Sequence, residues 1–548
     1  MSAGATQDAD LQRLIAELLV VRASGHLADH QRRYPRWELT NSELQALLEA
    51  GVGGVILLGG SSAELALRTG QLQHWADGRP LLLCADVEEG VGQRFEGASW
   101  LVPPLALGRL HRHSPEGALR LAERYGHCTG REARAVGLNW VLAPVCDVNN
   151  NPANPVINVR AWGEDPATAG ALAAAFTRGL QAEGVLGCAK HFPGHGDTDS
   201  DSHLELPVLP HSRSRLEAVE LPPFRDAIAA GVAAVMTAHL GLPALDPDRP
   251  ATLSPAVLSG LLRQELGFAG LVVTDALVME AIAGRYGAGE AAVLALEAGA
   301  DLVLMPADAR AAINAIAEAV AEGRLERGRL EASVARRRAA LAGLPRLGRT
   351  AADAGQAAGA DGGLARKLVS ATLEIRGRIL PPEAGGSGVN LIRLDQALQA
   401  PFLPAAAPAI TVAAAAGFRP CLLAGDTISP WSDDPQAPLA LERLGEGPVL
   451  VQLFVRGNPF RGHAGGSEPW PAALGQLLKA GRLAGLVVYG SPYLWDELRE
   501  LLPPGLPAGH SPGQMPLAQE EVLAGLGLGA GARYRSKAIA AAAAGFTD

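Results

Sequence analysis

The sequence predicts an α/β protein whose larger domain is a TIM-like (β/α)8 barrel. Eight short apolar runs lie within the first 345 of its 548 residues. Their apolarity is continuous rather than alternating, which is typical of parallel strands covered by helices on both faces. Amphipathic segments separate them, and several end in glycine, as helices prefer. Eight β–α units in about 340 residues match such a barrel, and a doubly wound sheet is the alternative.

The expected strands follow one another at 18–21, 53–60, 81–90, 139–148, 184–192, 233–240, 270–277 and 300–306. After them, residues 346–365 are small, polar and rich in Gly and Ala, which indicates a linker or a loose helix. Further strands are expected at 368–377, 389–394, 408–414, 447–455 and 484–490. We therefore expect a barrel over 1–345, a linker over 346–365 and a smaller α/β domain of unclear role over 366–548.

Composition restricts the class of protein and of partner. A hydrophobic content of 48% with 19% charged residues is that of a soluble globular chain. The formal net charge of −10 argues against a nucleic acid or an anionic membrane as the main partner. The five cysteines are scattered without a CxxC pair, so neither a disulfide framework nor a thiolate zinc site is expected.

The chain shows no sign of a secretion signal or a membrane span. Its N-terminus lacks a basic region followed by an apolar core. No apolar run approaches the ~18 residues needed to cross a bilayer. The cytoplasm is the expected location, and nothing in the sequence indicates an oligomeric state.

Polar residues follow several of the expected strands directly. Asp86, Lys190, His191, His239 and Asp275 each stand at the end of an apolar run. A barrel places its chemistry at the carboxyl ends of its strands. An aspartate after one strand is often only the N-cap of the next helix, so Asp275 alone would decide little. Several such strand ends on one face favour a site.

The segment KHFPGHGDTDSDSH, residues 190–203, concentrates charge between apolar flanks. His191 and His195 are four apart, but the intervening Pro and Gly exclude the helix that would aim both at one metal. A calcium loop would need Gly and Glu where Ser202 and Val208 stand. The GxxxxGK[ST] order of a phosphate-binding loop is missing. A solvated turn stays open by composition, and no metal is expected.

Acid/base chemistry is the remaining interpretation of this segment. Asp201 and His203, two residues apart on an irregular loop, can form a carboxylate–imidazole pair. The sequence has no GxSxG motif for a serine nucleophile. Asp275 can instead act as a carboxylate nucleophile. Together these residues describe a retaining glycosidase in which histidine replaces the usual carboxylic acid.

The motifs KHFPGHG and DSH resemble the signature of glycoside hydrolase family 3, in its bacterial β-N-acetylglucosaminidase branch. Further matching segments lie at 143–166, 235–240, 253–277 and 298–306. The resemblance spans about residues 10–345, essentially the whole expected barrel. The second domain sits where many members carry an αβα sandwich, although it contains no recognisable motif.

The resemblance implies a role for each matched residue. Asp275 would be the nucleophile, and His203 the general acid/base oriented by Asp201. The hydroxyls of the terminal sugar would be bound by Asp86, Arg94, Arg160, Lys190 and His191. Arg160 has a competing explanation, an ion pair with Glu164 or Asp165. His195, Asp197 and Asp199 are expected to shape the loop, and His239 is explained equally well as a hydrogen-bonded barrel residue.

One motif departs from the family. The usual pattern D-x-E-G-G-x-V-x-R becomes DVEEGVGQR at 86–94, with Glu89 in place of Gly and Gly92 in place of Val. A Glu adds a Cβ and a charge where Gly is expected. Either the turn has changed or the Glu89 side chain faces solvent.

The implied activity is retaining removal of terminal, non-reducing β-N-acetylglucosamine from oligosaccharides or peptidoglycan fragments, without a cofactor. A cytoplasmic enzyme of this kind suits cell-wall recycling. The alternative is a phosphorylase that uses the same residues, because imidazole does not repel phosphate as a carboxylate would. A sugar-binding barrel without activity is the alternative of another class.

Overall fold

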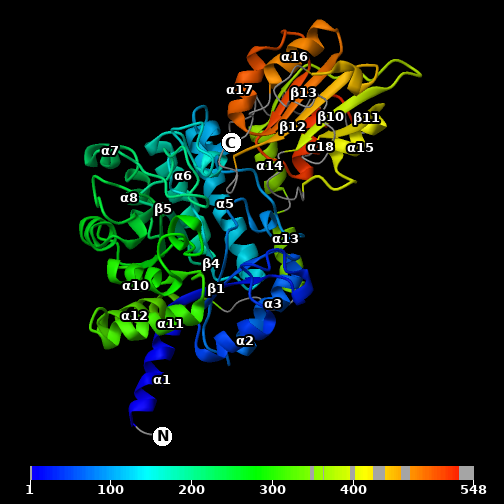
Figure 1. Ribbon diagram of the computed structural model, residues 1–548. Coiled ribbons are helices and arrows are strands. Elements are labelled where there is room, and N and C mark those ends of the chain that lie inside the picture. The colour runs from blue at the N-terminus through cyan, green and yellow to red at the C-terminus, as the bar shows by residue number, and fades with distance from the viewer. Residues whose placement is uncertain are drawn as a thin grey trace. The chain divides into compact units, whose positions relative to one another are not determined.

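The computed structural model describes residues 3–345, 351–361, 363–394, 402–423, 439–457 and 469–529. The chain divides into two compact units, Met1–Leu364 and Ala365–Asp548 (Figure 1). Residues 346–350 and 362 of the predicted linker lie outside the described residues. So do four parts of the predicted second domain, 395–401, 424–438, 458–468 and 530–548.

Among its described residues, the first unit contains eight strands, each of which overlaps one predicted apolar run. β1 (Leu19–Ser24), β2 (Gly54–Leu58), β3 (Leu82–Ala85), β4 (Trp140–Val141) and β8 (Val303–Leu304) form a five-stranded sheet in the order β4-β3-β2-β1-β8. β5 (Cys188–Phe192), β6 (Ala234–Thr237) and β7 (Leu271–Val273) form a second sheet. All pairings are parallel, and parallel bridges Trp140–Leu186 and Val273–Leu302 link the two sheets. The parallel α/β fold is confirmed; a complete eight-stranded barrel stays a prediction.

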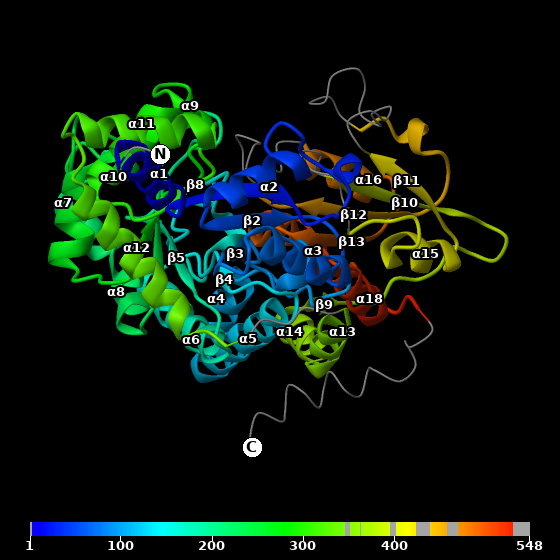
Figure 2. The ribbon, with the colours of Figure 1, turned by 90° about the horizontal axis from the view of Figure 1, so that it is seen from below.

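Helices lie outside these strands, as Figure 2 shows for α6, α8, α10 and α12. Local sequence sets their ends: α2 begins with a capping box between Thr40 and Glu43 and ends at left-handed Gly51. Glycine also allows α5 and α6 to pack closely, since a Cβ on Gly126 would lie 2.2 Å from the Phe176 carbonyl oxygen. The helices are α1 (Ala3–Ala16), α2 (Asn41–Ala50), α3 (Ser62–Trp75), α4 (Leu105–His111), α5 (Pro115–Ala135), α6 (Pro166–Ala182), α7 (Arg213–Ala218), α8 (Pro222–Ala229), α9 (Glu280–Ala283), α10 (Ala288–Ala298), α11 (Ala309–Ala321), α12 (Arg327–Ala342) and α13 (Ala351–Ala360).

Helix α13 lies within the segment predicted as a linker. It packs against α3 and α5 of the first unit. Ala354 and Ala357 are buried in that contact. This part of the segment is therefore a packed helix. No helix among the described residues combines the length and the apolarity needed to cross a membrane.

The second unit is built on a six-stranded sheet in the order β11-β10-β12-β13-β14-β9. Only β9 runs antiparallel to its neighbour. One core lies between the sheet and helices α16 and α17, and a second lies between the sheet and α15 and α18. The elements are α14 (Leu364–Thr372), β9 (Glu374–Arg376), β10 (Gly388–Leu394), α15 (Pro408–Ala415), β11 (Phe418–Leu423), β12 (Val449–Val455), α16 (Trp470–Lys479), β13 (Leu483–Gly490), α17 (Pro492–Glu500), β14 (Ala508–Ser511) and α18 (Pro516–Gly525).

Two strands predicted in this unit are wrong in whole or in part. Residues 408–414 form helix α15, because Pro408 at the first turn and the alanines that follow favour a helix over a short strand. Residues 368–372 end helix α14, and only Glu374–Arg376 of the predicted 368–377 is extended. Strands β11 and β14 were not predicted, since neither is a continuous apolar run.

Candidate active site

Asp275 stands two residues beyond the last residue of β7, at the carboxyl end of the strand. Its backbone N–H lies 3.3 Å from the Thr237 hydroxyl of β6, and its carboxylate accepts a hydrogen bond from the N–H of Ala276 at 2.8 Å. These contacts tie the carboxylate to two neighbouring strands. The side chain remains partly accessible.

Burial and charge act in opposite directions on Asp275. Burial raises the pKa of its carboxyl, but nearby imidazoles outweigh this effect and lower the pKa to about 2. These are the imidazoles of His239, His191 and His203. The carboxylate is therefore ionised at neutral pH, which a nucleophile requires.

His239 is held by hydrogen bonds on both ring nitrogens. Nε2 lies 3.0 Å from the Ala276 carbonyl oxygen and must donate to it. Nδ1 lies 2.8 Å from the Thr252 hydroxyl, which itself donates to the Ala238 carbonyl oxygen at 2.8 Å. Burial lowers the pKa of this histidine. The interpretation of His239 as a hydrogen-bonded structural residue accounts for these contacts.

Asp201 and His203 form the pair that their spacing predicts. Asp201 Oδ1 lies 2.8 Å from His203 Nδ1 and also accepts the His203 backbone N–H at 2.9 Å. Asp201 is 1% exposed, whereas the His203 side chain is 19% exposed. In general, a buried carboxylate on Nδ1 fixes the tautomer of an imidazole, so that proton exchange at such a histidine takes place at Nε2.

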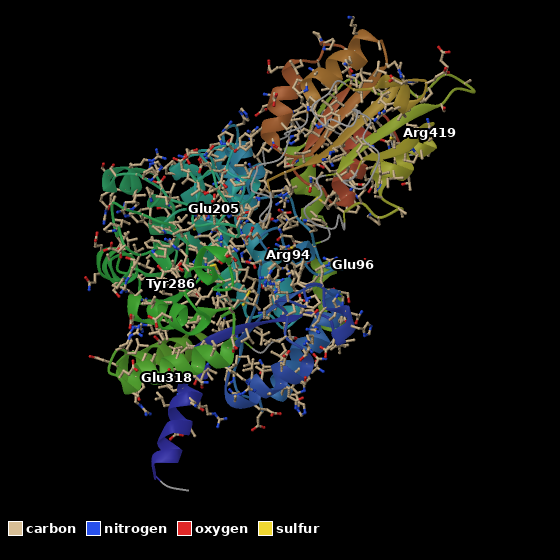
Figure 3. The ribbon with its side chains drawn as sticks, viewed as in Figure 1. Arg94, Glu96, Glu205, Tyr286, Glu318 and Arg419 are labelled. Atoms are coloured by element: carbon tan, nitrogen blue, oxygen red, sulfur yellow. The ribbon has the colours of Figure 1, made fainter. Side chains whose placement is uncertain are left out.

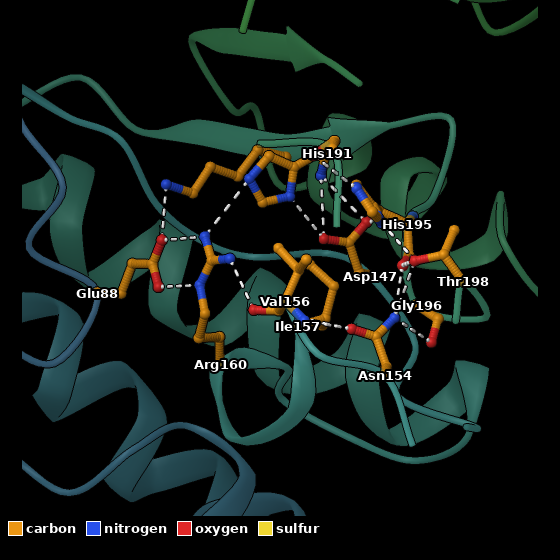
Figure 4. A network of polar contacts seen from close by, with 12 residues as sticks. Glu88, Asp147, Asn154, Val156, Ile157, Arg160, His191, His195, Gly196 and Thr198 are labelled. Atoms are coloured by element: carbon orange, nitrogen blue, oxygen red, sulfur yellow. Dashed lines mark hydrogen bonds and ion pairs between the residues drawn. The ribbon is translucent and has the colours of Figure 1, made fainter. Parts of the chain in front are cut away.

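The loop that carries Asp201 and His203, residues 194–203, is held in place by the residues around it. The His195 ring contacts the hydroxyls of Thr198 and Ser202 at 2.8 and 3.0 Å. The Asn154 amide donates to the carbonyl oxygens of His195 and Gly196 (Figure 4). His195 thus supports the residue between Asp201 and His203. Burial lowers the pKa of His195 to about 4, so it is neutral at pH 7.

A second contact fixes the start of the loop. Asp197 pairs with His211 at 2.9 Å and with Arg215 at 3.1 Å, and Arg215 pairs with Glu220 at 3.2 Å. Asp197, His211 and Glu220 are the one group among the described residues with atoms close enough to share a metal ion. The Arg215 guanidinium already supplies a positive charge there.

Most of the predicted sugar-binding residues belong to one ionic network, and Figure 4 shows the part of it around Glu88, Arg160 and His191. Lys190 Nζ lies 2.7 Å from both Asp86 Oδ1 and Glu88 Oε1. Arg160 forms a bidentate pair with Glu88, with both N–O distances 2.8 Å. Its NH2 lies 3.5 Å from Nε2 of His191. Four of the five predicted residues are therefore brought together.

The competing explanation for Arg160 is wrong. Glu164 instead pairs with Arg109 and Arg112. Asp165 caps helix α6 through the Thr168 N–H. Both acids are committed to surface helices.

Two acidic residues in this network were missed by sequence reasoning. Glu88 is 4% exposed; burial raises its pKa, but Arg160 and Lys190 hold the pKa well below its usual range. Asp147 accepts hydrogen bonds from the His191 ring at 2.7 Å and from the His195 backbone at 2.7 Å. A signal existed for both, since each follows the apolar part of a predicted strand.

Arg94, labelled in Figure 3, donates from Nε to the Asp86 backbone carbonyl at 3.0 Å. This contact places Arg94, the fifth of the predicted sugar-binding residues, beside the carboxyl end of β3. The DVEEGVGQR motif alone does not show which protein family the chain belongs to.

Comparison of the whole chain with known families does show it. The family "Glycosyl hydrolase family 3 N terminal domain" matches residues 11–339, and "Bacterial Glycosyl hydrolase family 3 C-terminal domain" matches residues 382–526.

The chain belongs to glycoside hydrolase family 3. The predicted family and the enzyme class, glycoside hydrolase, are confirmed. Over 271 residues it is 39% identical to the beta-hexosaminidase of Stenotrophomonas maltophilia (strain K279a), which covers 49% of this chain and 80% of that protein.

One solved family 3 structure covers almost all of this chain, and a second solved structure covers 61% of it. A beta-N-acetylglucosaminidase from Paenibacillus sp. str. FPU-7 is 31% identical with a TM-score of 0.72, over 94% of this chain and 96% of its own. A beta-N-acetylhexosaminidase from Beutenbergia cavernae DSM 12333 is 30% identical with a TM-score of 0.54, over 61% and 98%.

The departure from the family 3 pattern at 86–94 has a structural basis. Glu89 is 1% exposed and accepts a hydrogen bond from the Trp100 indole at 2.9 Å, so the alternative in which its side chain faces solvent is wrong. The Leu101 N–H donates to the Glu89 carbonyl at 2.8 Å. A Cβ on Gly92 would lie 2.3 Å from the Ala98 carbonyl oxygen, which leaves no room for Val. Segment 98–101 packs against this turn.

Proposed function

We propose that this protein is a retaining hydrolase of terminal, non-reducing β-N-acetylglucosamine residues, working through a covalent intermediate on Asp275. The observation that carries the proposal is the set of three groups at the strand ends. It consists of an ionised Asp275, surrounded by imidazoles, and the 2.8 Å pair of Asp201 with His203. We also propose that the two parallel sheets of the first unit close into a (β/α)8 barrel, with this set at its carboxyl face.

In the first step, a carboxylate oxygen of Asp275 attacks the anomeric carbon, and His203 Nε2 gives its proton to the departing oxygen. The imidazole is protonated before this step, and the buried carboxylate of Asp201 stabilises that charge. In the second step, the now neutral His203 removes a proton from water, which attacks the glycosyl–Asp275 ester with a second inversion. The product keeps the β configuration, and both residues return to their starting states.

Asp86, Arg94, Arg160, Lys190 and His191 would bind the hydroxyls of the terminal sugar. Glu88 would hold Arg160 and Lys190 in position, because its carboxylate oxygens lie 2.7 to 2.8 Å from their side-chain nitrogens. Burial lowers the pKa of Lys190, but Asp86 and Glu88 outweigh it and raise the pKa, so the ammonium stays charged. Charged donors in a buried setting form strong, directional hydrogen bonds to hydroxyl groups.

The choice of sugar is supported by relatives. The Stenotrophomonas relative is a beta-hexosaminidase, and the Paenibacillus structure is a beta-N-acetylglucosaminidase. The oligosaccharide that supplies the sugar, a peptidoglycan fragment or a chitooligosaccharide, follows from neither name. Cytoplasmic cell-wall recycling stays a prediction.

A panel of 4-nitrophenyl β-glycosides tests the proposal: N-acetylglucosaminide, glucoside and xyloside, each with and without inorganic phosphate. We expect the N-acetylglucosaminide to exceed the glucoside by at least ~10-fold in kcat/KM. Similar rates on both sugars contradict the proposed specificity. Sugar 1-phosphate as the product in phosphate buffer would replace hydrolysis with phosphorolysis, and inactivity on the whole panel would favour a binding protein.

A further inference from the structure

The segment that follows His203 places apolar side chains at the surface. Among the described residues, five large hydrophobic side chains are exposed, and two of them belong to this segment: Leu204, at 48%, and Val208, at 54%. Glu205, labelled in Figure 3, lies between them. Single exposed hydrophobic residues are normal on soluble proteins, whereas a group of them indicates a binding surface.

The chain after Leu204 alternates between outward and inward positions. Leu206 is partly exposed and Val208 is exposed, while Pro207 and Leu209 are buried. Alternation with a period of two is that of an extended chain, whose successive side chains point to opposite sides. Leu206 and Val208 therefore share the outward side. Together with Leu204 they form a surface that we call the apolar rim.

One end of the apolar rim is fixed to the proposed proton donor. The Leu204 N–H donates to the Asp201 carbonyl oxygen at 2.9 Å. In the same turn, the Asp201 carboxylate accepts the hydrogen bonds of the His203 backbone and ring. Leu204 is therefore held against the Asp201–His203 pair by a hydrogen bond as well as by its place in the sequence.

The other end of the apolar rim is fixed to the carboxyl end of β6. The backbone on both sides of Val208 pairs with Gly241 through hydrogen bonds of 2.8 and 2.9 Å. A Cβ on Gly241 would lie 3.1 Å from Val208 Cγ2, so the Val208 side chain packs over this glycine. Gly241 stands two residues after His239. The His239 ring in turn contacts the carbonyl oxygen of Ala276, the neighbour of Asp275, at 3.0 Å.

The proposed reaction sets where the leaving group lies. Asp275 attacks the anomeric carbon from one side, and the departing oxygen leaves from the opposite side, within hydrogen-bond reach of His203 Nε2. Neighbouring Cα atoms lie about 3.8 Å apart, so an aglycone a few carbon atoms long can reach Leu204 from that oxygen. The charged network around Glu88 suits the hydroxyls of the sugar, and the apolar rim suits a group rich in carbon.

We propose that the apolar rim binds the aglycone and favours one that carries an alkyl or aryl group next to the glycosidic oxygen. The inference rests on the proposed function and narrows its substrate class. An apolar aglycone that covers these side chains removes both surfaces from water, which favours binding. An aglycone covered with hydroxyls gains less from the same contact, because its polar groups lose water there.

Two substrates test this inference: ethyl and n-hexyl N-acetyl-β-D-glucosaminide. Their leaving alcohols have nearly the same acidity and differ in apolar length, and the release of N-acetylglucosamine gives kcat/KM for both. We expect wild type to favour the hexyl glycoside by roughly tenfold or more, part of what full burial of four methylene groups provides. The double variant Leu204→Ser/Val208→Ser should lower that ratio about fivefold or more.

The matched control is Leu67→Ser, because Leu67 is 50% exposed on helix α3 and lies outside the apolar rim. It should leave the ratio within about twofold of wild type. Both substrates are assayed on the same preparation, so the ratio does not depend on the folded fraction.

A wild-type enzyme that hydrolyses both glycosides with the same kcat/KM overturns this inference alone. A double variant that keeps the wild-type ratio, or that loses activity equally on both substrates, would also overturn it. Sedimentation velocity of wild type and the double variant provides the second arm. A wild-type dimer that the variant does not form would assign the apolar rim to a second copy of the chain, against the inference. Inactivity of wild type on both glycosides would overturn the proposed function and this inference with it.

Discussion

Replacing Asp201 with Asn removes one negative charge from the catalytic pair and keeps the size of the side chain. The carboxylate accepts two hydrogen bonds from His203, at 2.8 and 2.9 Å, and is 1% exposed. A hydrogen bond to a charged group contributes about 1.5–3 kcal/mol. If Asn stabilises the His203 imidazolium by that much less than Asp does, the barrier to cleavage of a disaccharide rises by the same amount. The kcat then falls by about 10- to 150-fold, since 1.36 kcal/mol is a factor of ten.

The leaving group separates this effect from others. A sugar alkoxide needs a proton as it departs, whereas 4-nitrophenolate needs little help. For the aryl substrate, formation of the glycosyl-enzyme should be nearly unimpaired, and its hydrolysis, weakened in base catalysis, should become slow. Rapid-mixing assays should then show a burst of nitrophenolate. His203→Ala should give the same pattern more strongly, with a loss of about 10²–10⁴ on the disaccharide.

The control is Asp199→Asn, an exposed aspartate of the same loop, which should stay within about twofold of wild type. If Asp201→Asn or His203→Ala slows both leaving groups equally and shows no burst, His203 only binds substrate. The proton donor would then lie elsewhere.

Three further predictions concern stability and the second unit. Glu88→Gln leaves buried Lys190 and Arg160 short of a counter-charge, so the free energy of unfolding, measured by thermal unfolding, should fall by about 3–5 kcal/mol. The control is Glu164→Gln, in a partly exposed ion pair, which should lower it by no more than about 1 kcal/mol; equal losses would contradict the argument. Folding keeps the pKa of His195 near 4, below the ordinary 6.5, so the folded state is favoured above pH 6.5 and loses that advantage as the pH falls toward 4. Relative to His195→Gln, wild type should therefore lose about 2 kcal/mol between pH 6.5 and 5, and a constant difference would argue against a neutral buried imidazole. Single Ala replacements of Asp and Glu beyond residue 366 should keep kcat within about tenfold, and a thousandfold loss at one of them would contradict the role of His203.

Much of the first unit could be predicted because its strands are buried on both faces. Such strands produce continuous apolar runs, and each of the eight runs contains one strand. The second unit shows where this signal fails. The run at 408–414 is as apolar as a strand but forms helix α15, and β14 is missed because Gly509, His510 and Ser511 are not apolar. A short apolar run does not by itself show whether it forms a strand or part of a helix; the length of the run and the residues that flank it are also needed.

The same limit applies to the site. Asp275 was predicted because it directly follows an apolar run, and Asp201 and His203 were predicted because a carboxylate and an imidazole stand two residues apart on a polar loop. Sequence spacing also could not show that Arg160 turns to Glu88, 72 positions away, rather than to Glu164.

Asp201 and His203 belong to one short stretch of chain, and this has a consequence for how the enzyme can diversify. The carboxylate and the imidazole keep their pairing wherever the stretch is placed, since the contact is made between residues two apart. Insertions or deletions at its ends can therefore deepen or widen the entrance for bulkier leaving groups without disturbing proton transfer. The Asp201–His203 contact is therefore set within the loop itself, separately from the strand end that holds Asp275. Exchange of residues 194–203 between relatives should carry leaving-group preference with it while the choice of sugar stays with the strands.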